Sequence, residues 1–435
     1  MTLDIYQFFQ ATNPSRTLAV ENEEDQKYYI DFAAVRGGQI IEKLRHKIAF
    51  FSSDEPTCEL FTGHIGCGKS TELLRLKVEL EQDGFHVVYF ESDQDLEMGD
   101  VDAGDILLAI ARRVSESLET TGINLRPGYF QRLFSEVKEI LQTPVELTTD
   151  VEFSVGIATI TAQAKSSPKL RDKLRGFLEP RTDGIIQAIN RELLAPAIQK
   201  LKQQGCRGLV VLVDNLDQIA PAPKAWGRPQ PEYLFVDRGT QLRRLHCHII
   251  YTIPLALRFS DDFGRLTASF MVDPKVLPMV PVQLRDGRDH EKGMALLRQL
   301  VLARAFPNIA ADQRLARLLD VFDSPRTLDR LCRASGGHVR NLLRFLNDWI
   351  QEDRQLPLTH ESLETVIRVR RNELVLSIDT QEWDALRQVV QHKTVAGNQD
   401  YQALIRSMFV YEYRDREGSW FDINPILAEA KEFQS

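Results

Sequence analysis

The chain has 435 residues, 43% of them hydrophobic and 27% charged, with a net charge of −8 and a sequence pI near 5.7. This length is too great for one compact core, and this composition excludes a disordered chain and predicts two or three soluble domains. The negative charge argues against a surface that binds nucleic acid everywhere, although a local basic patch stays open.

The first residues do not predict a leader, since Met1 to Tyr6 has no basic region followed by an apolar stretch. No apolar run approaches the length of a membrane span. The cysteines are odd in number, scattered and without CxxC spacing, which predicts neither a disulfide framework nor a zinc site. We therefore expect a cytoplasmic protein with no membrane partner.

Residues 1–56 are predicted to form an N-terminal linker and a lead-in helix, because apolar residues recur there at helical spacing: Ile40, Ile41, Leu44 and Ile48. Residues 58–62 then predict a buried strand, 70–82 a helix and 85–90 a second strand. This order is a βαβ unit, which implies a parallel sheet with a right-handed crossover. It opens an α/β domain that we expect to cover 57–286.

The loop between that strand and helix carries a phosphate-binding pattern, or P-loop. Gly63 to Ser70 fits G-x-x-x-x-G-K-[ST] at every fixed position. Its glycines let successive backbone N–H groups point at phosphate oxygens, and the helix N-terminus adds its positive dipole end. Lys69 is expected to hold the β- and γ-phosphates and Ser70 to ligate Mg²⁺. Against the alternative of a chance Gly-rich turn, the pattern predicts an ATP site formed by Gly63, His64, Ile65, Gly66, Cys67, Gly68, Lys69, Ser70 and Thr71.

The stretch between the second strand and the next buried strand is less regular. Residues 105–118 have helical spacing, and 120–144 are polar and irregular. Residues 145–164 alternate and are rich in Thr and Val, which predicts a hairpin inserted near there. A long helix is predicted over 184–204.

Gly208 to Val213 is an apolar run of β-forming residues, typical of a strand buried on both faces. Asp214 follows it directly, where a P-loop site needs a carboxylate to hold the metal together with Ser70. Asp217, one turn further, is the weaker candidate, because an acidic residue after a strand often only caps a helix.

Further along, residues 221–231 are rich in proline and predict a loop, and 248–252 and 276–283 predict strands. Helical patterns dominate beyond residue 286, so we expect a helical lid over 287–375.

The tail carries the strand-like segments 409–413 and 420–423 on either side of a turn with Gly418, which predicts a hairpin. Helices followed by one hairpin predict a winged-helix-like module over 376–435. Its charges are mixed, because glutamates and an aspartate offset its arginines, so charge does not indicate DNA: Arg406, Arg414 and Arg416 against Glu412, Asp415 and Glu417.

In these motifs the chain resembles the AAA+ superfamily of P-loop ATPases, in the branch shared by STAND signalling ATPases and origin-recognition-type initiators. The resemblance covers roughly residues 30–350 and rests on four segments: Gly63 to Ser70, Leu209 to Asp217, the sensor-like Tyr251 to Pro254, and the lid-like Ser335 to Arg340. It implies that Thr252 contacts the γ-phosphate or the attacking water and that Arg340 reaches the phosphates. The alternative for Thr252 is an ordinary β-branched strand residue, and the alternative for Arg340 is a solvated helix residue. His338 is read as a surface or packed histidine rather than a metal ligand.

The chain departs from the family pattern at one position. The family usually has a carboxylate directly after the metal-side aspartate, and this chain has Asn215. An amide orients water but does not take its proton at neutral pH, so we expect slow hydrolysis or a substitute role for Asp217. The resemblance also implies an arginine finger from a neighbouring subunit. Its identity stays open among Arg238, Arg258 and Arg265, although most arginines are solvated or ion-paired.

The sequence thus predicts an α/β P-loop NTPase domain with a parallel sheet, a helical lid and a C-terminal winged-helix-like module. The predicted function is an ATPase that uses ATP and Mg²⁺ and acts as a nucleotide-driven conformational switch or remodelling factor. Asp214, Asn215, Asp217 and Thr252 are its expected catalytic residues. By resemblance we expect a homo-oligomer, or a protein partner bound through the C-terminal module. The alternatives are a DNA-binding initiator or loader and, less favoured, a P-loop small-molecule kinase, which needs neither sensor-like segments nor a long helical C-terminal part.

Overall fold

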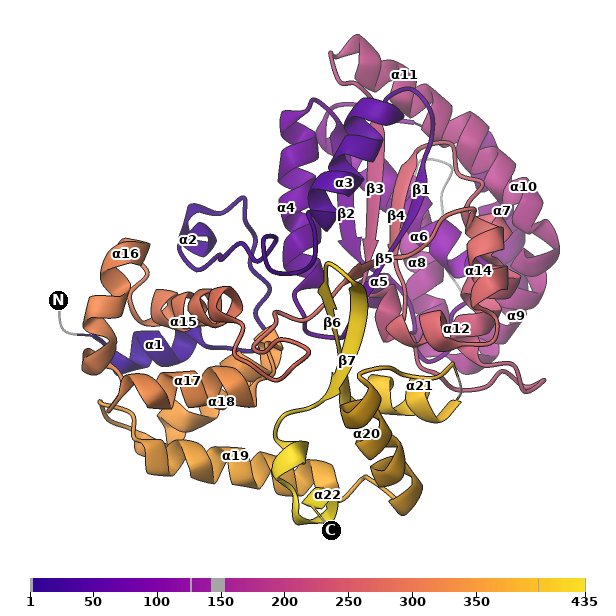
Figure 1. Cartoon of the computed structure of the whole chain (residues 1–435). Coiled ribbons are helices and arrows are strands. Elements are labelled where there is room, and N and C mark those ends of the chain that lie inside the picture. Colours follow the sequence, from indigo (N-terminus) through magenta and orange to yellow (C-terminus); the bar gives the residue numbers. More distant parts are fainter. Residues whose placement is uncertain (1–2, 126, 142–152, 398, 435) are drawn as a thin grey trace.

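The computed structural model describes residues 3–125, 127–141, 153–397 and 399–434. Figure 1 shows an α/β domain, a group of helices beside it, and a C-terminal hairpin between the two. The predicted α/β fold class is confirmed.

A five-stranded parallel sheet with the strand order β2-β3-β4-β1-β5 is the centre of the α/β domain. Its strands are β1 (Cys58–Gly63), β2 (His86–Glu91), β3 (Leu209–Asp214), β4 (His248–Thr252) and β5 (Lys275–Leu277). β4 lies between β1 and β3, since Phe61 pairs with Thr252 and Tyr251 pairs with Val213. Because the strands are parallel, the carboxyl ends of β1, β3 and β4 meet at one edge of the sheet.

Helices cover both faces of the sheet, which explains why β3 is buried at every position. On one face, Val210 and Leu212 pack in one cluster with α3 (Ile40–His46) and α4 (Lys69–Gln82). On the other, Val211 and Val213 pack with α6 (Ala103–Thr120), α10 (Thr182–Ala188) and α11 (Ala195–Gln203). A strand covered twice needs apolar residues at successive positions, as the sequence of β3 has.

The segment between β2 and β3 is helical, and two predictions fail there. Residues predicted as irregular form α7 (Gly128–Leu141). In the predicted hairpin, residues 153–164 belong to α8 (Phe153–Ser166), and 145–152 lie outside the described residues. The other elements of this segment are α5 (Ser92–Asp95), α9 (Pro168–Leu178), η2 (Glu179–Arg181) and η3 (Ile189–Leu194), a π-helical turn that joins α10 to α11 into the predicted long helix.

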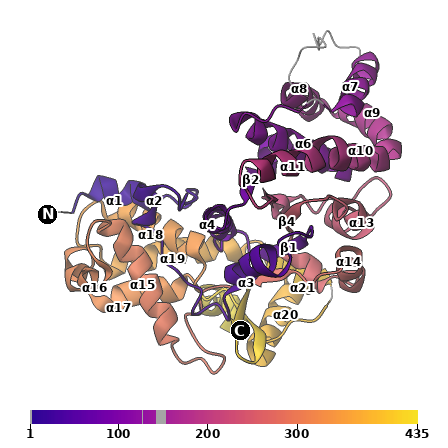
Figure 2. The ribbon, with the colours of Figure 1, turned by 90° about the horizontal axis from the view of Figure 1, so that it is seen from above.

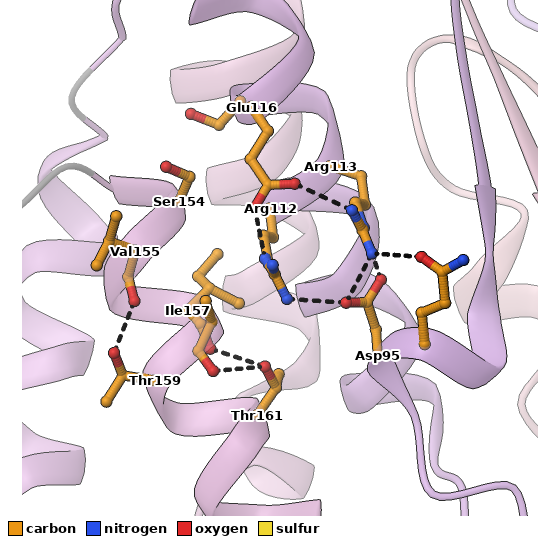
Figure 3. Close-up of polar contacts among 12 residues, drawn as sticks. Asp95, Arg112, Arg113, Glu116, Ser154, Val155, Ile157, Thr159 and Thr161 are labelled. Carbon is orange, nitrogen blue, oxygen red and sulfur yellow. Dashed lines mark hydrogen bonds and ion pairs between the residues drawn. The ribbon is translucent and has the colours of Figure 1, made fainter.

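The alternation in α8 predicted a strand wrongly, because its threonine hydroxyls form their hydrogen bonds to carbonyls within the helix. Thr159 Oγ1 donates to the Val155 carbonyl at 2.9 Å and Thr161 Oγ1 donates to the Ile157 carbonyl at 3.0 Å (Figure 3). Ile157 and Ile160, three residues apart on one face, are buried in the cluster that contains α6. The tertiary contact of that face with α6 therefore overrides the β propensity of Thr and Val.

The region predicted as a lid, which keeps that name below, is helical and contains α15 (Glu291–Ala305), α16 (Ala311–Arg314), η7 (Leu315–Asp320), α17 (Pro325–Ala334), α18 (Val339–Asp353) and α19 (His360–Val375). The segment predicted as a linker joins it, because α1 (Ile5–Ala11) packs on α15 and α18 (Figure 2). Phe8 and Phe32 are buried in the lid core, and Asn347 Nδ2 donates to Thr12 Oγ1 at 2.9 Å.

The C-terminal region contains α20 (Thr380–His392), α21 (Gln399–Arg406) and the predicted hairpin, formed by β6 (Val410–Asp415) and β7 (Gly418–Ile423), followed by η8 (Leu427–Glu429) and α22 (Lys431–Gln434). Tyr411, Tyr413 and Trp420 of the hairpin pack in the same cluster as α3, α4 and β1. The strand predicted over 276–283 is shorter, because the chain beyond it bonds to the hairpin instead of the sheet. β5 ends at Leu277, and the Met279 N–H donates to the Glu412 carbonyl of the hairpin.

Short helical turns complete the described structure: α2 (Glu23–Gln26), η1 (Lys47–Phe51), η4 (Leu216–Gln218), α12 (Gln230–Glu232), η5 (Tyr233–Asp237), α13 (Gly239–Leu242), η6 (Leu255–Phe259) and α14 (Phe263–Phe270). Within the described residues, no helix combines the length and the apolar character needed to cross a membrane.

Candidate nucleotide-binding site

The P-loop connects β1 to α4 with the backbone geometry that its glycines allow. Gly66 and Gly68 have φ values of 85° and 105°, in the left-handed region that favours glycine. A Cβ on Gly66 would lie 2.8 Å from the Cβ of Arg340. Lys69 begins α4, and its Nζ donates to the carbonyls of Gly63 at 3.0 Å and His64 at 2.9 Å. The lysine side chain therefore folds back over the loop, where a phosphate would be held.

Asp217 is the ion-pair partner of Lys69, with 3.0 Å between Nζ and Oδ2 and both side chains buried. Burial is the largest single effect and acts to lower the pKa of Lys69, but the charge and hydrogen bond of Asp217 together with the nearby Cys67 and Asp214 outweigh it. This pKa therefore lies above its ordinary value and the ammonium stays charged. Among the described residues, nothing donates a hydrogen bond to Asp217 Oδ1. The pair places one cation and one carboxylate with spare acceptor capacity at the P-loop.

Asp214 ends β3 and is completely buried. Its carboxylate accepts hydrogen bonds from the Tyr89 hydroxyl at 2.9 Å and from the Asn215 N–H at 2.8 Å. Burial and then the charge of Asp217 raise the pKa of Asp214 above its ordinary value, while a hydrogen bond with Ser70 opposes them. The structure therefore brings the two predicted metal-side residues together.

The donor set fits Mg²⁺, which prefers hard oxygen ligands and keeps several from water and phosphate. A hydroxyl and a nearby carboxylate are the protein groups that a P-loop site supplies. Within the described part of the chain, no three His, Cys, Asp or Glu side chains are grouped so as to hold a metal by themselves. Ser70 and Asp214 would accordingly hold the ion only together with the phosphates of a nucleotide.

Asn215 has a left-handed backbone, with φ 63°, and both ends of its amide are engaged. Its Nδ2 donates to Asp93 Oδ1 at 2.8 Å, and its Oδ1 accepts from Gln218 Nε2 at 2.7 Å. Sequence reasoning missed Asp93 and Gln218. The signal for Asp93 was its position two residues after β2, because the carboxyl ends of neighbouring parallel strands meet: Glu91 pairs in register with Asp214.

Thr252 is buried at the end of β4 and bonds to the backbone of the turn after β3. Its hydroxyl donates to the Val213 carbonyl at 3.3 Å and accepts from the Leu216 N–H at 3.0 Å. In this conformation Thr252 therefore supports the turn that carries Asp214 and Asp217. Its predicted contact with phosphate or water stays a prediction.

The lid contacts the P-loop through the start of α18. His338 is the N-cap residue: its Nδ1 accepts from the Asn341 N–H at 3.0 Å, and its Nε2 donates to the Ile65 carbonyl at 2.7 Å. Burial lowers the pKa of His338 to about 3, so the ring is neutral. The packed-histidine reading of His338 is confirmed. Arg340 lies next to it, and its N–H donates to the Gly66 carbonyl at 3.2 Å.

Arg36 is another basic residue beside the P-loop. Sequence reasoning missed it, because a lone arginine in a loop carries no signal. It is buried, and its Nη2 donates to the Cys67 carbonyl at 2.7 Å. Among the described residues its Nε has no hydrogen-bond partner. The N-terminal segment thus places the positive charge of Arg36 next to the P-loop backbone at Cys67.

A cavity of about 80 Å³ lies between the P-loop, the lid and the N-terminal segment, and it is lined by most of these groups: Pro14, Arg16, Thr17, Ile65, Gly66, Gly68, Lys69, Ser70, Thr71, Asn215, Asp217, Gln218, Val339, Arg340 and Leu343. His64 points instead to the hairpin, where its Nε2 accepts from the Glu412 N–H at 2.9 Å. Cys67 is buried with Sγ 3.6 Å from the Leu277 carbonyl. The structure therefore assembles most of the predicted P-loop residues around one cavity.

The candidate arginine fingers are all ion-paired within the chain and do not line this cavity. Arg238 pairs with Glu179, Arg258 with Glu412 at 2.7 Å, and Arg265 with Asp262 at 2.8 Å. Arg258 in particular connects the turn after the sensor-like strand to the buried carboxylate of the hairpin.

No described protein family and no curated protein matches the sequence. Solved structures that are similar include a Walker-type ATPase of Pyrococcus abyssi, with 12% identity over 97% of this chain and 99% of that chain and a TM-score of 0.45. The ORC2 protein of Aeropyrum pernix, in ADPNP and ADP complexes, has 12% identity over 91% of each chain and a TM-score of 0.41. A chain of Drosophila ORC bound to DNA has 10% identity over 98% of this chain and 91% of that chain and a TM-score of 0.39.

Proposed function

We propose that the chain binds ATP with Mg²⁺ at the P-loop cavity and hydrolyses it to ADP and phosphate. The observation that carries this proposal is the convergence of Lys69, Ser70 and Asp214 at one edge of a parallel sheet. The glycine conformations at Gly66 and Gly68 support it, because they are the ones a phosphate cradle needs.

On nucleotide binding, the Lys69 ammonium exchanges its ion pair with Asp217 for the β- and γ-phosphates. Ser70 and Asp214 would hold the metal, which would supply positive charge to neutralise the phosphates. Arg36 and Arg340, at the back of the loop and on the lid, add positive charge near the same phosphates.

We propose further that the nucleotide controls the relative position of the lid and the C-terminal hairpin. Both already bond to P-loop backbone or side chains, through His338 to Ile65 and through Glu412 to His64. A phosphate that reshapes the loop would alter both contacts, as expected of a nucleotide-driven switch or remodelling factor. A protein partner or a second copy of the chain is then the proposed recipient of this change.

The test is a titration of the purified protein with a fluorescent ATP analogue and Mg²⁺. Lys69→Ala should weaken binding at least tenfold, because the lysine supplies the P-loop's cation. Lys77→Ala on the same helix, whose ammonium contacts Glu21 and Glu81 at the surface, is the matched control and should bind like the parent. Equal affinity of the parent and Lys69→Ala in folded protein would refute the site.

The DNA-binding alternative uses the same ATP site and differs at the C-terminal module. The tip of the hairpin mixes Arg414 and Arg416 with Glu417, and its Asp415 pairs with Arg285 at 2.7 Å, so its charge favours a protein partner. Binding of duplex DNA that falls steeply with salt would favour the initiator or loader reading. The kinase alternative predicts that ATP turnover depends on an added metabolite.

A further inference from the structure

Three polar side chains form a hydrogen-bonded chain that ends at the P-loop cavity. Asp93 Oδ1 accepts from Asn215 Nδ2 at 2.8 Å, and Asn215 Oδ1 accepts from Gln218 Nε2 at 2.7 Å. Asn215 and Gln218 line the cavity together with Lys69 and Ser70. Asp93 is exposed and stands at the outer end of the chain.

The position of Asp93 is held by the elements around it. Asp95, two residues further in α5, accepts from Arg112 Nη1 at 2.8 Å and from Arg113 Nε at 2.7 Å (Figure 3). The Lys165 ammonium at the end of α8 donates to the Asp93 carbonyl at 2.8 Å. The turn that carries Asp93 is thereby attached to α6 and α8.

A carboxylate only accepts hydrogen bonds, and this fixes the direction of both amides. Asn215 must turn its NH₂ group to Asp93 and its oxygen to Gln218. Gln218 must then turn its NH₂ group to Asn215, which leaves its Oε1 as the terminal acceptor. Among the described residues, nothing donates to this oxygen.

Asp217, the other acidic residue of the turn, is ion-paired with Lys69 at 3.0 Å. Only its Oδ2 contacts the lysine, and Oδ1 accepts no hydrogen bond from the described residues. The chain from Asp93 to Gln218 differs from Asp217 in that hydrogen bonds fix the direction of its terminal acceptor.

We propose, on the basis of the proposed ATPase function, that Gln218 Oε1 positions the attacking water and that Asp93 orients Gln218 through Asn215. The chain would replace the carboxylate that the turn lacks at position 215. In the step itself, the water oxygen bonds to the γ-phosphorus and the bond from that phosphorus to the β–γ bridging oxygen breaks. The water proton passes to a phosphate oxygen, because an amide orients water but is not basic enough to keep its proton. Gln218 touches the reacting water, and Asp93 is a positioning residue.

The experiment measures the dissociation constant of Mg·ATP and the kcat of its hydrolysis in the same preparations. Gln218→Leu should lower kcat roughly 10- to 100-fold, as expected when a reactant loses its alignment, with an unchanged dissociation constant. Asp93→Asn should lower kcat about 3- to 10-fold, because an asparagine can also donate and no longer sets the direction of the amides. Gln94→Leu, which alters the neighbouring exposed amide of α5, is the control and should keep the parent kcat.

An exchange of the pair separates orientation from a structural role. Asn215→Asp alone sets two carboxylates within hydrogen-bonding distance, and their repulsion should break the chain and lower kcat. The double variant Asp93→Asn with Asn215→Asp restores a donor at position 93 and an acceptor toward Gln218, so kcat should return at least to the parent value. A thermal melt of each variant checks that the fold is intact.

The outcomes are distinct for the two proposals. A parent that hydrolyses ATP while Gln218→Leu and Asp93→Asn keep its kcat overturns this inference and leaves the ATPase proposal standing. Variants that bind Mg·ATP more weakly but keep the parent kcat overturn it too. So does a double variant that stays as slow as Asp93→Asn. A parent that binds ATP without hydrolysing it overturns the inference but not nucleotide binding. A parent that binds no ATP overturns both.

Discussion

Individual residues at the site carry buried charge that the fold only partly compensates. Asp214 is the clearest case, because burial and the charge of Asp217 both raise its pKa. A carboxyl whose pKa is higher in the folded chain than in the unfolded one favours the protonated form on folding. Its contribution to stability is therefore lost as the pH rises from the unfolded pKa, about 3.9, through the raised folded value. An ionised Asp214 thus lowers the stability of the folded chain. A buried carboxylate with this cost is expected at a site that binds a metal, and a purely structural role would not require it.

We predict that Asp214→Asn raises the melting temperature of the nucleotide-free protein by about 2 °C, the shift that about 1 kcal/mol produces in a chain of this size range. The amide removes the buried charge and still accepts the Asn215 N–H. The same variant should lose the Mg²⁺ stimulation of ATP binding. Differential scanning fluorimetry with and without Mg·ATP measures both effects. A lower melting temperature would mean that the hydrogen bonds to the carboxylate outweigh its desolvation.

Thr252 offers a second test at the residue scale. Thr252→Val keeps the shape of the side chain but leaves the buried Leu216 N–H without its acceptor, so we expect a loss of about 1–3 kcal/mol in the free energy of unfolding. Thr267→Val, at a half-buried position of α14 where the hydroxyl only donates to the Gly264 carbonyl of its own helix, is the control. Urea unfolding without nucleotide decides the matter, because a threonine that only senses phosphate would leave this free energy unchanged.

At the scale of elements, the start of α18 joins the lid to the P-loop through a neutral histidine. Its low pKa means that His338 takes up a proton in the unfolded chain, near the ordinary value of about 6.5, but not in the folded one. The folded state is consequently favoured above that pH and loses stability as the pH falls below it. His64, also buried with a pKa lowered well below its ordinary value, adds a term of the same sign.

We predict that the free energy of unfolding falls with pH below about 6.5, by about 1.4 kcal/mol per pH unit for each of these histidines once both titrate in the unfolded chain. His338→Asn keeps an N-cap acceptor for α18 and should remove one of the two contributions. Urea titrations at several pH values between 5 and 8 give the slope for both proteins. A slope that is the same in the variant would show that His338 does not carry it.

The helices between β2 and β3 show where local patterns mislead. Residues 153–164 alternate like a strand, yet they form α8 because its apolar face packs on α6. Residues 128–141 form α7, with Phe130, Leu133 and Val137 buried at helical spacing within a polar segment. By contrast β3 and β4 were predicted within a residue of their bounds, since an apolar run covered on both faces has few alternatives.

At the scale of the whole molecule, the C-terminal hairpin is part of the core of the P-loop domain. Trp420 stacks on Tyr413 with ring centroids 4.5 Å apart, and both pack with α3, α4 and β1. Tyr413 also donates to the Gly336 carbonyl of the lid at 2.8 Å. A module that shares its core with two other regions is expected to unfold with them.

We predict that Trp420→Ala lowers the free energy of unfolding by about 3–5 kcal/mol and shifts a single cooperative transition instead of splitting it. The exposed Trp226, changed to Ala, should alter stability by no more than about 0.5 kcal/mol. Calorimetry of both variants gives the comparison. Two separate transitions in the parent would show that the hairpin belongs to an independent domain.

The sequence by itself determined the P-loop, the buried strands and the helical character of the lid, because each depends on residues that are neighbours in the chain. Glycines with left-handed φ, a lysine at the start of a helix and a run of apolar residues act within a few positions of one another. Asp214 was predictable for the same reason, as the residue directly after such a run.

Only the tertiary structure decided which side chains meet at the cavity. Asp93 and Asn215 are 122 positions apart, and His64 and Glu412 are 348 apart, yet each pair is joined by a hydrogen bond. These contacts depend on strand order, on register and on how the hairpin docks, none of which is recorded in local periodicity. A polar residue shows its partner only when the packing of apolar faces has set the distance between them, which is why the chain from Asp93 to Gln218 was invisible in the sequence.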